Sequence, residues 1–470
     1  MFAAGVAYPP RYPHTDRMLS PESTGGSVSY ARRIGLFSAT MLVIGGIIGS
    51  GVFLNPSIVA QRTGSAGLTL GVWALGALIA LVGAFVFGEL GRRRPMAGGG
   101  YVYLRDAYGA LPAFLYAWSL LLMTATGATA AVAVTFASYA APLLGLSAQA
   151  QLPLAVGAIA LLSLVNMVGV APGAVTQNVF TVLKLVALAA LIIAGLLAPA
   201  AEPLACVDCV ALTPPVGASA LVLSVGTALV PVLFAYGGWQ QTNFVAEELI
   251  APERNLPRAM VLGVLAVVVV YLLANVTYLR ALGVEGLANS RAPAADTMQR
   301  YFGTTGRTLI AAGIAVSTFG FLNLVILVSP RVYQAMARDG LFFRSFATLH
   351  PRFRTPVVAI AFQGAWAIAL VFSGSYGQLL DYVVFSDWIF FGLIASTLFV
   401  FRRREPTTPL TFRVPLYPWS VVLFLAAAVY VVAGSVASNP GNAIRGTLLL
   451  ASGVPVFRYW RHRTAGVDAK

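Results

Sequence analysis

Long apolar blocks, separated by short polar or charged stretches, run along most of this chain. A membrane-spanning helix needs roughly 20 mainly apolar residues, and many of the blocks reach that length. The pattern predicts an all-α polytopic membrane protein with about twelve transmembrane helices. The expected spans are residues 35–61, 67–91, 109–144, 152–171, 174–198, 216–249, 257–282, 305–337, 356–373, 376–401, 416–436 and 442–459.

Glycines interrupt two of these spans, the first and the sixth, near their middle. The sequences there are Ile44-Gly45-Gly46-Ile47-Ile48-Gly49-Ser50-Gly51 and Phe234-Ala235-Tyr236-Gly237-Gly238-Trp239. Each glycine weakens a helix by about 1 kcal/mol relative to alanine. A break is tolerated in a membrane only where the freed backbone faces protein, water or a ligand. Two breaks in corresponding positions therefore indicate a transporter's substrate site.

The positions of the breaks also predict how the chain is organised. Four further spans follow each broken helix, which is the 5+5 inverted-repeat layout of many secondary transporters. The expected divisions are a disordered cytoplasmic tail (1–34), the first repeat (35–199), an extracytoplasmic loop (200–215), the second repeat (216–404), two further spans (405–459) and a cytoplasmic tail (460–470).

Composition and charge agree with a membrane protein. Hydrophobic residues make up 58% of the 470 residues and charged residues only 10%, with a net charge of +14. A basic balance can indicate a nucleic-acid partner. Here most arginines fall in the loops on one side of the predicted bundle, which is the positive-inside pattern. We therefore expect a cell inner-membrane protein with both termini in the cytoplasm, and no nucleic-acid binding.

The two cysteines, Cys206 and Cys209, lie in the predicted extracytoplasmic loop. A disulfide could form there, and the C-x-x-C spacing also suits a redox pair or half of a metal site. All three histidines fall in predicted cytoplasmic segments. We therefore favour a local clamp or free thiols, and expect neither a metal nor a cofactor.

The two breaks present complementary backbone groups. The outer half of the first helix begins with free N–H groups and the positive end of its dipole, which suit a carboxylate. The first half of the sixth span ends near Phe234 to Gly237 and leaves unpaired carbonyls that suit an ammonium. Together the breaks predict a site for a zwitterionic α-amino acid, formed by Ile47, Ile48, Gly49, Ser50, Gly51 and the stretch from Phe234 to Gly237. The alternative is a pair of glycine packing seams between helices.

Three side chains add candidate chemistry. Lys184 lies at mid-depth of the fifth span and Asp387 early in the tenth. A charge inside a membrane is costly, so each is expected to face the protein interior. Lys184 could neutralise, carry a proton or replace a bound cation; Asp387 could line the pocket, form a pair or lie near the surface. Trp239, directly after Gly238, is the best candidate for a side-chain gate.

Several motifs together resemble the amino acid–polyamine–organocation superfamily, and within it the L-type amino acid transporter family. They are Ile47-Ile48-Gly49-Ser50-Gly51-Val52-Phe53, Phe234-Ala235-Tyr236-Gly237-Gly238-Trp239, Glu247-Glu248 followed by Pro252-Glu253-Arg254-Asn255-Leu256-Pro257-Arg258, Gly98-Gly99-Gly100-Tyr101-Val102-Tyr103-Leu104-Arg105-Asp106, and Ala337-Arg338-Asp339-Gly340. The likeness runs from the first span to the arginines after the tenth.

The resemblance implies a fold similar to the leucine transporter and sodium-independent exchange of amino acids. It implies that backbone at Ile47, Ser50 and Gly51 holds the substrate carboxylate, and that carbonyls of Ile47, Phe234 and Gly237 hold its ammonium. Trp239 would border the side-chain pocket. Lys184 matches a family lysine that occupies the place of a sodium ion.

Some positions depart from the family pattern. Val325 falls where a serine near that lysine is common, and Asp387 falls where an asparagine is expected. Gln240 and Gln241 make the pocket more polar than in large-neutral transporters. The loop near residues 145–152 lacks the cysteine that links animal members to a glycoprotein subunit, so no such partner is expected.

The sequence thus predicts a sodium-independent exchanger of zwitterionic, mainly neutral amino acids. One alternative is a proton-coupled symporter that uses Lys184 or Asp387. Another is a non-transporting amino acid sensor, although the polar ends are short for an output domain.

Overall fold

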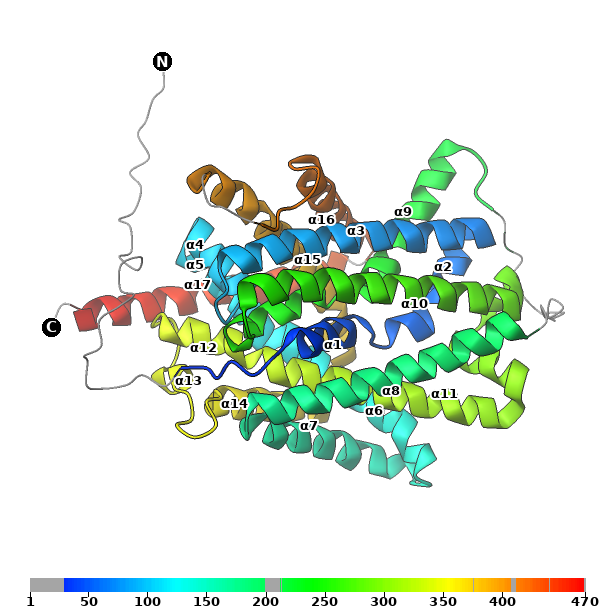
Figure 1. Cartoon of the computed structure of the whole chain (residues 1–470), viewed down its shortest axis with the longest axis horizontal. Coiled ribbons are helices and arrows are strands. Elements are labelled where there is room, and N and C mark those ends of the chain that lie inside the picture. The colour runs from blue at the N-terminus through cyan, green and yellow to red at the C-terminus, as the bar shows by residue number, and fades with distance from the viewer. Residues whose placement is uncertain are drawn as a thin grey trace, which may run out of the picture.

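The chain is described by a computed structural model that covers residues 29–198, 212, 214–374, 376–406, 411–438 and 440–468. Cys206 and Cys209 lie outside the described residues, so their pairing stays a prediction. Helices make up nearly all of the bundle (Figure 1). A single bridge between Ile34 and Leu249 is the one β-type pairing in the described ranges.

The first half of the chain contains these elements: α1 (Leu36–Ile47), α2 (Gly51–Thr63), α3 (Ala66–Arg93), α4 (Gly100–Tyr108), α5 (Ala110–Ser119), η1 (Leu120–Thr124), α6 (Ala125–Leu143), η2 (Ala148–Ala150), α7 (Gln151–Met167) and α8 (Val170–Leu197). The second half contains α9 (Ala218–Ala235), η3 (Trp239–Glu248), α10 (Pro252–Asn289), α11 (Pro293–Val328), α12 (Pro330–Arg338), α13 (Arg344–Ala347), α14 (Val357–Ser373), α15 (Tyr376–Arg404), α16 (Trp419–Ser438) and α17 (Pro440–Asp468).

These helices coincide with the twelve spans expected from the apolar pattern. Eight helical segments in the described residues are long and apolar enough to cross a membrane, and the pair α1–α2 makes up to nine. The other three expected spans coincide with α14, α15 and α17. The chain is therefore an all-helical, multi-pass membrane protein, as predicted.

Both glycine-rich interruptions break their helices. A bend of 42° separates α1 from α2. In the other segment, α9 ends at Ala235 and a 3-10 helix begins at Trp239. Gly238, between them, has a φ of 106°, a conformation that glycine adopts without strain. The inverted symmetry of the two halves stays a prediction.

One end of the bundle collects arginine side chains. In Figure 1 the described chain begins at this end, which also holds α4, α12, α13 and the end of α17. We call it the arginine-rich end, defined by Arg92, Arg93, Arg94, Arg105, Arg338, Arg402, Arg403 and Arg404.

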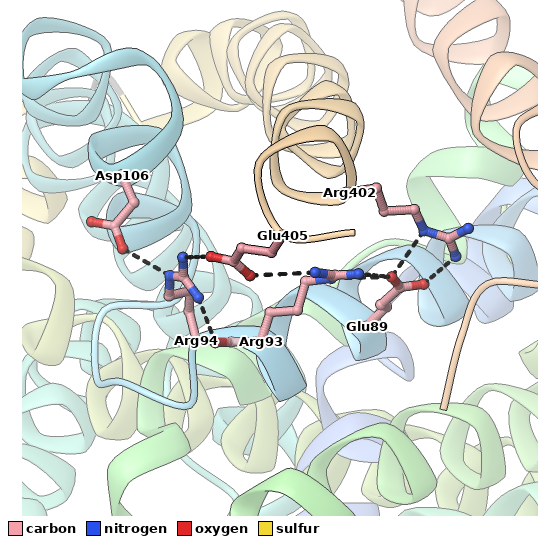
Figure 2. Close-up of polar contacts among 6 residues, drawn as sticks. All are labelled: Glu89, Arg93, Arg94, Asp106, Arg402 and Glu405. Atoms are coloured by element: carbon pink, nitrogen blue, oxygen red, sulfur yellow. Dashed lines mark hydrogen bonds and ion pairs between the residues drawn. The ribbon is translucent and has the colours of Figure 1, made fainter. Parts of the chain in front are cut away.

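A fully buried carboxylate, Glu89, organises this end (Figure 2). Arg402 of α15 binds both of its oxygens, and Arg93 donates to Oε1 from Nε at 3.1 Å and from Nη2 at 3.0 Å. The backbone N–H of Val414 donates to Oε2 at 2.7 Å. One acid near the end of α3 therefore fixes the ends of α3 and α15 and the segment that leads to α16.

The ion pairs continue from Glu89 across the same end. Arg93 reaches Glu405 at 3.4 Å, and Arg94 joins Glu405 to Asp106 of α4 (Figure 2). Charge-assisted contacts of this kind hold helix ends more firmly than neutral ones.

Asp339, directly after α12, ties α4 to this network. It pairs with Arg105 at 3.0 Å and accepts a hydrogen bond from the Tyr101 hydroxyl at 2.8 Å. Burial, and then the nearby charge of Asp339, raise the pKa of Tyr101. Its hydroxyl therefore stays protonated and acts as the donor.

Glu89→Gln is expected to destabilise the folded protein by about 3–5 kcal/mol, because it leaves two partly or fully buried arginines without their shared counter-charge. The measurement is thermal unfolding of the purified protein in detergent. Glu253→Gln is the control, since Glu253 is exposed in the first turn of α10. Equal melting temperatures for the two variants would contradict the prediction.

Candidate substrate site between the two broken helices

The two helix breaks lie against each other through their glycines. A Cβ atom placed on Gly238 would lie 2.1 Å from the Gly46 carbonyl oxygen, and one placed on Gly46 would lie 2.8 Å from the Gly238 oxygen. Next to them, a Cβ on Gly51 would lie 2.9 Å from the Ala235 side chain. Such distances leave no room for any side chain, so the sequence needs glycine at these positions for the breaks to meet.

Tyr271 of α10 connects the two breaks. Its buried hydroxyl lies 2.9 Å from the Ile47 carbonyl oxygen and 3.2 Å from the Ala235 carbonyl oxygen. A hydroxyl carries one proton and donates to one of these acceptors at a time. Tyr271 thus adds a side-chain donor to the backbone at both breaks.

Lys184 of α8 gives a second set of donors to the first break. Its fully buried ammonium donates to the Ile48 carbonyl at 2.8 Å and to the Gly45 carbonyl at 3.3 Å. The Ser317 hydroxyl of α11 also donates to the Ile48 carbonyl, at 3.3 Å. This hydroxyl is two turns away from Val325, the position where the family pattern commonly has a serine. Val325 itself lines the nearby cavity.

A cavity of about 180 Å³ opens beside the breaks. Both breaks contribute to its wall, together with α5, η1, α6, α11 and α15. The lining includes residues of the two breaks and polar side chains from the surrounding helices. They are Gly46, Ile47, Gly49, Ser50, Gly51, Tyr116, Thr124, Thr135, Gly237, Gly238, Gln240, Gln241, Thr318, Ser329 and Asp387. The volume suits one small molecule rather than a large ligand.

Most of the residues expected from the sequence come together in this wall. They are Ile47, Gly49, Ser50, Gly51, Phe234, Gly237, Gln241 and Asp387. Lys184 is not part of the wall but lies behind the first break. Trp239 is also not in the wall: its buried indole packs on Phe87, with ring centroids 4.8 Å apart, and on Phe391, 5.9 Å apart. Phe391 is the aromatic residue between Trp239 and the cavity.

The carbonyls expected to bind an ammonium already have protein donors. The Phe234 oxygen accepts from the Gly237 N–H at 3.1 Å. The Ile47 oxygen accepts from the Gly49 N–H at 2.9 Å and from the Tyr271 hydroxyl at 2.9 Å. A carbonyl oxygen has two lone pairs, so a substrate ammonium would have to take the place of one of these donors at Ile47.

Two side chains in the wall carry unused acceptors. The Oε1 atom of Gln241 is buried and accepts no hydrogen bond from any residue that the structure describes. The Asp387 carboxylate has no hydrogen bond or ion pair to any described residue, in contrast to Gln240, which accepts from the Gly238 N–H at 3.0 Å. Buried acceptors without partners are costly. The wall is therefore prepared to receive donors from a bound molecule.

Sequence reasoning missed Tyr271, Tyr116 and the π-helical turn η1. Tyr271 lies in an ordinary apolar span and has no local signal. η1 interrupts the helix between α5 and α6 and contributes Leu120 and Thr124 to the cavity. Single π-turns occur frequently at functional sites.

Comparison with known proteins decides the family. Residues 34–453 match the family model described as amino acid permease, which is most of the chain. The chain belongs to the amino acid permease family. The resemblance stated from the motifs is confirmed, and the permease is a membrane transporter of amino acids rather than an enzyme.

Relatives align with nearly the whole permease. The large neutral amino acids transporter small subunit 2 of Homo sapiens is 33% identical, over 94% of this chain and 84% of its own length. The serine/threonine exchanger SteT of Bacillus subtilis is 32% identical, over 92% of this chain and 98% of its own. The b(0,+)-type amino acid transporter 1 of Homo sapiens is 32% identical, over 88% and 84% respectively.

Tyr271→Phe is expected to lower the free energy of unfolding by about 1–3 kcal/mol and to slow transport, because a donor to buried carbonyls is lost. Tyr278→Phe is the matched control, because Tyr278 lies two turns further along α10 and its buried hydroxyl has no partner within the described ranges. Melting temperature and uptake into liposomes are measured for both. Similar losses in both variants would show that the Tyr271 hydroxyl does not hold the breaks.

Gly238→Ala is expected to abolish substrate binding, because its Cβ would push the two breaks apart. Gly109→Ala separates this clash from backbone strain: Gly109 has a φ of 96° but nothing within 4 Å of a Cβ atom. The two glycines differ in ψ, but alanine at a positive φ costs about 1–3 kcal/mol at either position. Amino acid binding is followed by calorimetry on the purified proteins. Retained binding by Gly238→Ala would contradict the close approach of the breaks.

Proposed function

We propose that the permease is a sodium-independent exchanger of zwitterionic α-amino acids that works by alternating access. The observation that supports this most is the meeting of two broken helices beside one cavity. Their backbone groups match the two charged ends that every α-amino acid has, whereas the rest of the wall contacts the variable side chain.

Lys184 supports independence from sodium. Carbonyls of unwound helices are the groups that coordinate sodium in sodium-coupled transporters with broken helices. In the permease, an ammonium already donates to the Gly45 and Ile48 carbonyls. A fixed positive charge at this place repels a second cation, since the two would lie only a few ångströms apart.

The distribution of arginines supports an orientation. The arginine-rich end would face the cytoplasm by the positive-inside rule, with both termini on that side, in the cell inner membrane. We further propose that the permease acts without a disulfide-linked glycoprotein subunit, because the loop near residues 145–152 has no cysteine.

Proton-coupled symport is the second candidate, and Asp387 favours it. A carboxylate in the cavity wall without a described partner could take up a proton on one side of the membrane and release it on the other. An exchanger would instead leave this group in one state throughout the cycle and use it only to select side chains.

Transport by the reconstituted permease decides between the two candidates. As an exchanger, wild type takes up labelled neutral amino acids only into liposomes preloaded with amino acid, unaffected by sodium or proton gradients. Asp387→Asn should keep this exchange within about threefold, because no step loses or gains its charge; a change that small corresponds to less than 1 kcal/mol. Glu285→Gln, at an exposed site on α10, is the control.

The opposite result identifies the symporter. Uptake into empty liposomes, driven by a proton gradient and lost in Asp387→Asn, would overturn the exchanger proposal. Failure to transport any amino acid from a complete panel would overturn the zwitterion site itself.

A further inference from the structure

A second cavity, of about 330 Å³, lies at the arginine-rich end, apart from the substrate cavity. The ends of α3 and α15 form part of its wall, and the segment before α16 forms the rest. Its charged and aromatic residues are Arg93, Arg402, Arg403, Arg413, Glu405 and Tyr417. The transport mechanism proposed above uses none of them.

The cavity carries an excess of positive charge. Four guanidinium groups line it, against the carboxylate of Glu405 in the wall and that of Glu89 behind it. The two carboxylates pair with Arg93 and Arg402, whereas Arg403 forms no ion pair with a described residue. Glu405 opposes an anion at its own side of the cavity, where Arg93 and Arg94 bind it.

Two of the arginines are held in place before any ligand arrives. Figure 2 shows Arg93 and Arg402 fixed on opposite sides of Glu89. Arg402 uses Nε and Nη2 on this carboxylate, and its guanidinium lies 3.9 Å from the centre of the Tyr417 ring. Nη1 of Arg402 has no partner in the described part of the chain. A pre-oriented guanidinium loses little entropy when it binds an anion.

Arg403 is the adaptable member of the group. It is exposed, and no described residue forms a hydrogen bond or ion pair with its side chain. It can therefore close on a ligand that Arg402 binds in the same cavity. Planar guanidinium groups bind phosphate oxygens in pairs, which makes arginine the preferred residue for this anion.

The surroundings of the cavity indicate contact with lipid. Leu416, just before α16, is 83% exposed, and Trp419, the first residue of α16, is 73% exposed. Tryptophan is enriched where a membrane protein meets the headgroup region. A soluble anion would gain nothing from these apolar neighbours, whereas a phospholipid could place its acyl chains against them.

We propose that this cavity binds the phosphate group of an anionic phospholipid. Basic pockets between transmembrane helices are known to receive such headgroups. The phosphate would lie between Arg402 and Arg403, with its chains alongside Leu416 and Trp419. Because the cavity joins α3, α15 and the segment before α16, the bound lipid would stabilise this end of the bundle.

The test is native mass spectrometry of the full permease in detergent, titrated with phosphatidylglycerol or with phosphatidylcholine. One phosphatidylglycerol is expected to bind in preference to phosphatidylcholine. Arg403→Gln should weaken its binding about fivefold, the effect of one arginine near an anionic headgroup. Arg344→Gln is the matched control, because Arg344 is also exposed, lies in α13 at the same end of the bundle and is outside the cavity.

Each other outcome counts against the proposal. Equal binding of both lipids, or equal binding by the Arg403→Gln and Arg344→Gln variants, would overturn the site. If inorganic phosphate raises the melting temperature as much as phosphatidylglycerol does, and Arg403→Gln removes the effect, the lipid assignment is overturned in favour of a soluble phosphate group. Melting temperatures of the ligand-free variants establish that both are folded.

Discussion

Backbone hydrogen bonding at the two helix breaks is the constraint on which the rest of this structure depends. A helix that stops inside a membrane exposes carbonyls and N–H groups where no lipid can satisfy them. In the permease, side chains of three other helices donate hydrogen bonds to these carbonyls: Lys184 of α8, Tyr271 of α10 and Ser317 of α11. Their positions fix which helices surround the breaks, and so determine where the cavity forms.

At the arginine-rich end, too, a buried polar group is satisfied by donors from other parts of the chain, but there the groups are charged. Glu89 is as deeply buried as Lys184, but it is satisfied by arginines and a backbone N–H rather than by carbonyls. At the centre of the bundle a cation meets neutral acceptors, whereas at this end opposite charges meet.

The sequence alone was enough for the helices and for the positions of the two breaks, because both depend on local patterns. Apolar length predicted the spans, and glycine runs predicted the breaks at Gly49 and Gly238. The partners of individual side chains could not be predicted from the sequence. The Tyr271 hydroxyl binds a carbonyl 224 positions away, and no residue near Tyr271 indicates this contact. Trp239 shows how far a local signal reaches. Its neighbour Gly238 is at the break, but the indole packs behind the cavity wall, on Phe87 and on the wall residue Phe391.

The π-helical turn η1 has a consequence for how the cavity wall tolerates change in chain length. A π-turn holds one residue more than the α-helix that it interrupts, and one residue rotates a helix by about 100°. Removing a residue from 120–124 would thus leave a continuous, well-bonded helix whose two parts no longer face the same way. Tyr116 and Thr135, on opposite sides of the turn, could not then both face the cavity. Deleting a residue from this stretch would therefore disturb the cavity wall, even at positions where a substitution would not.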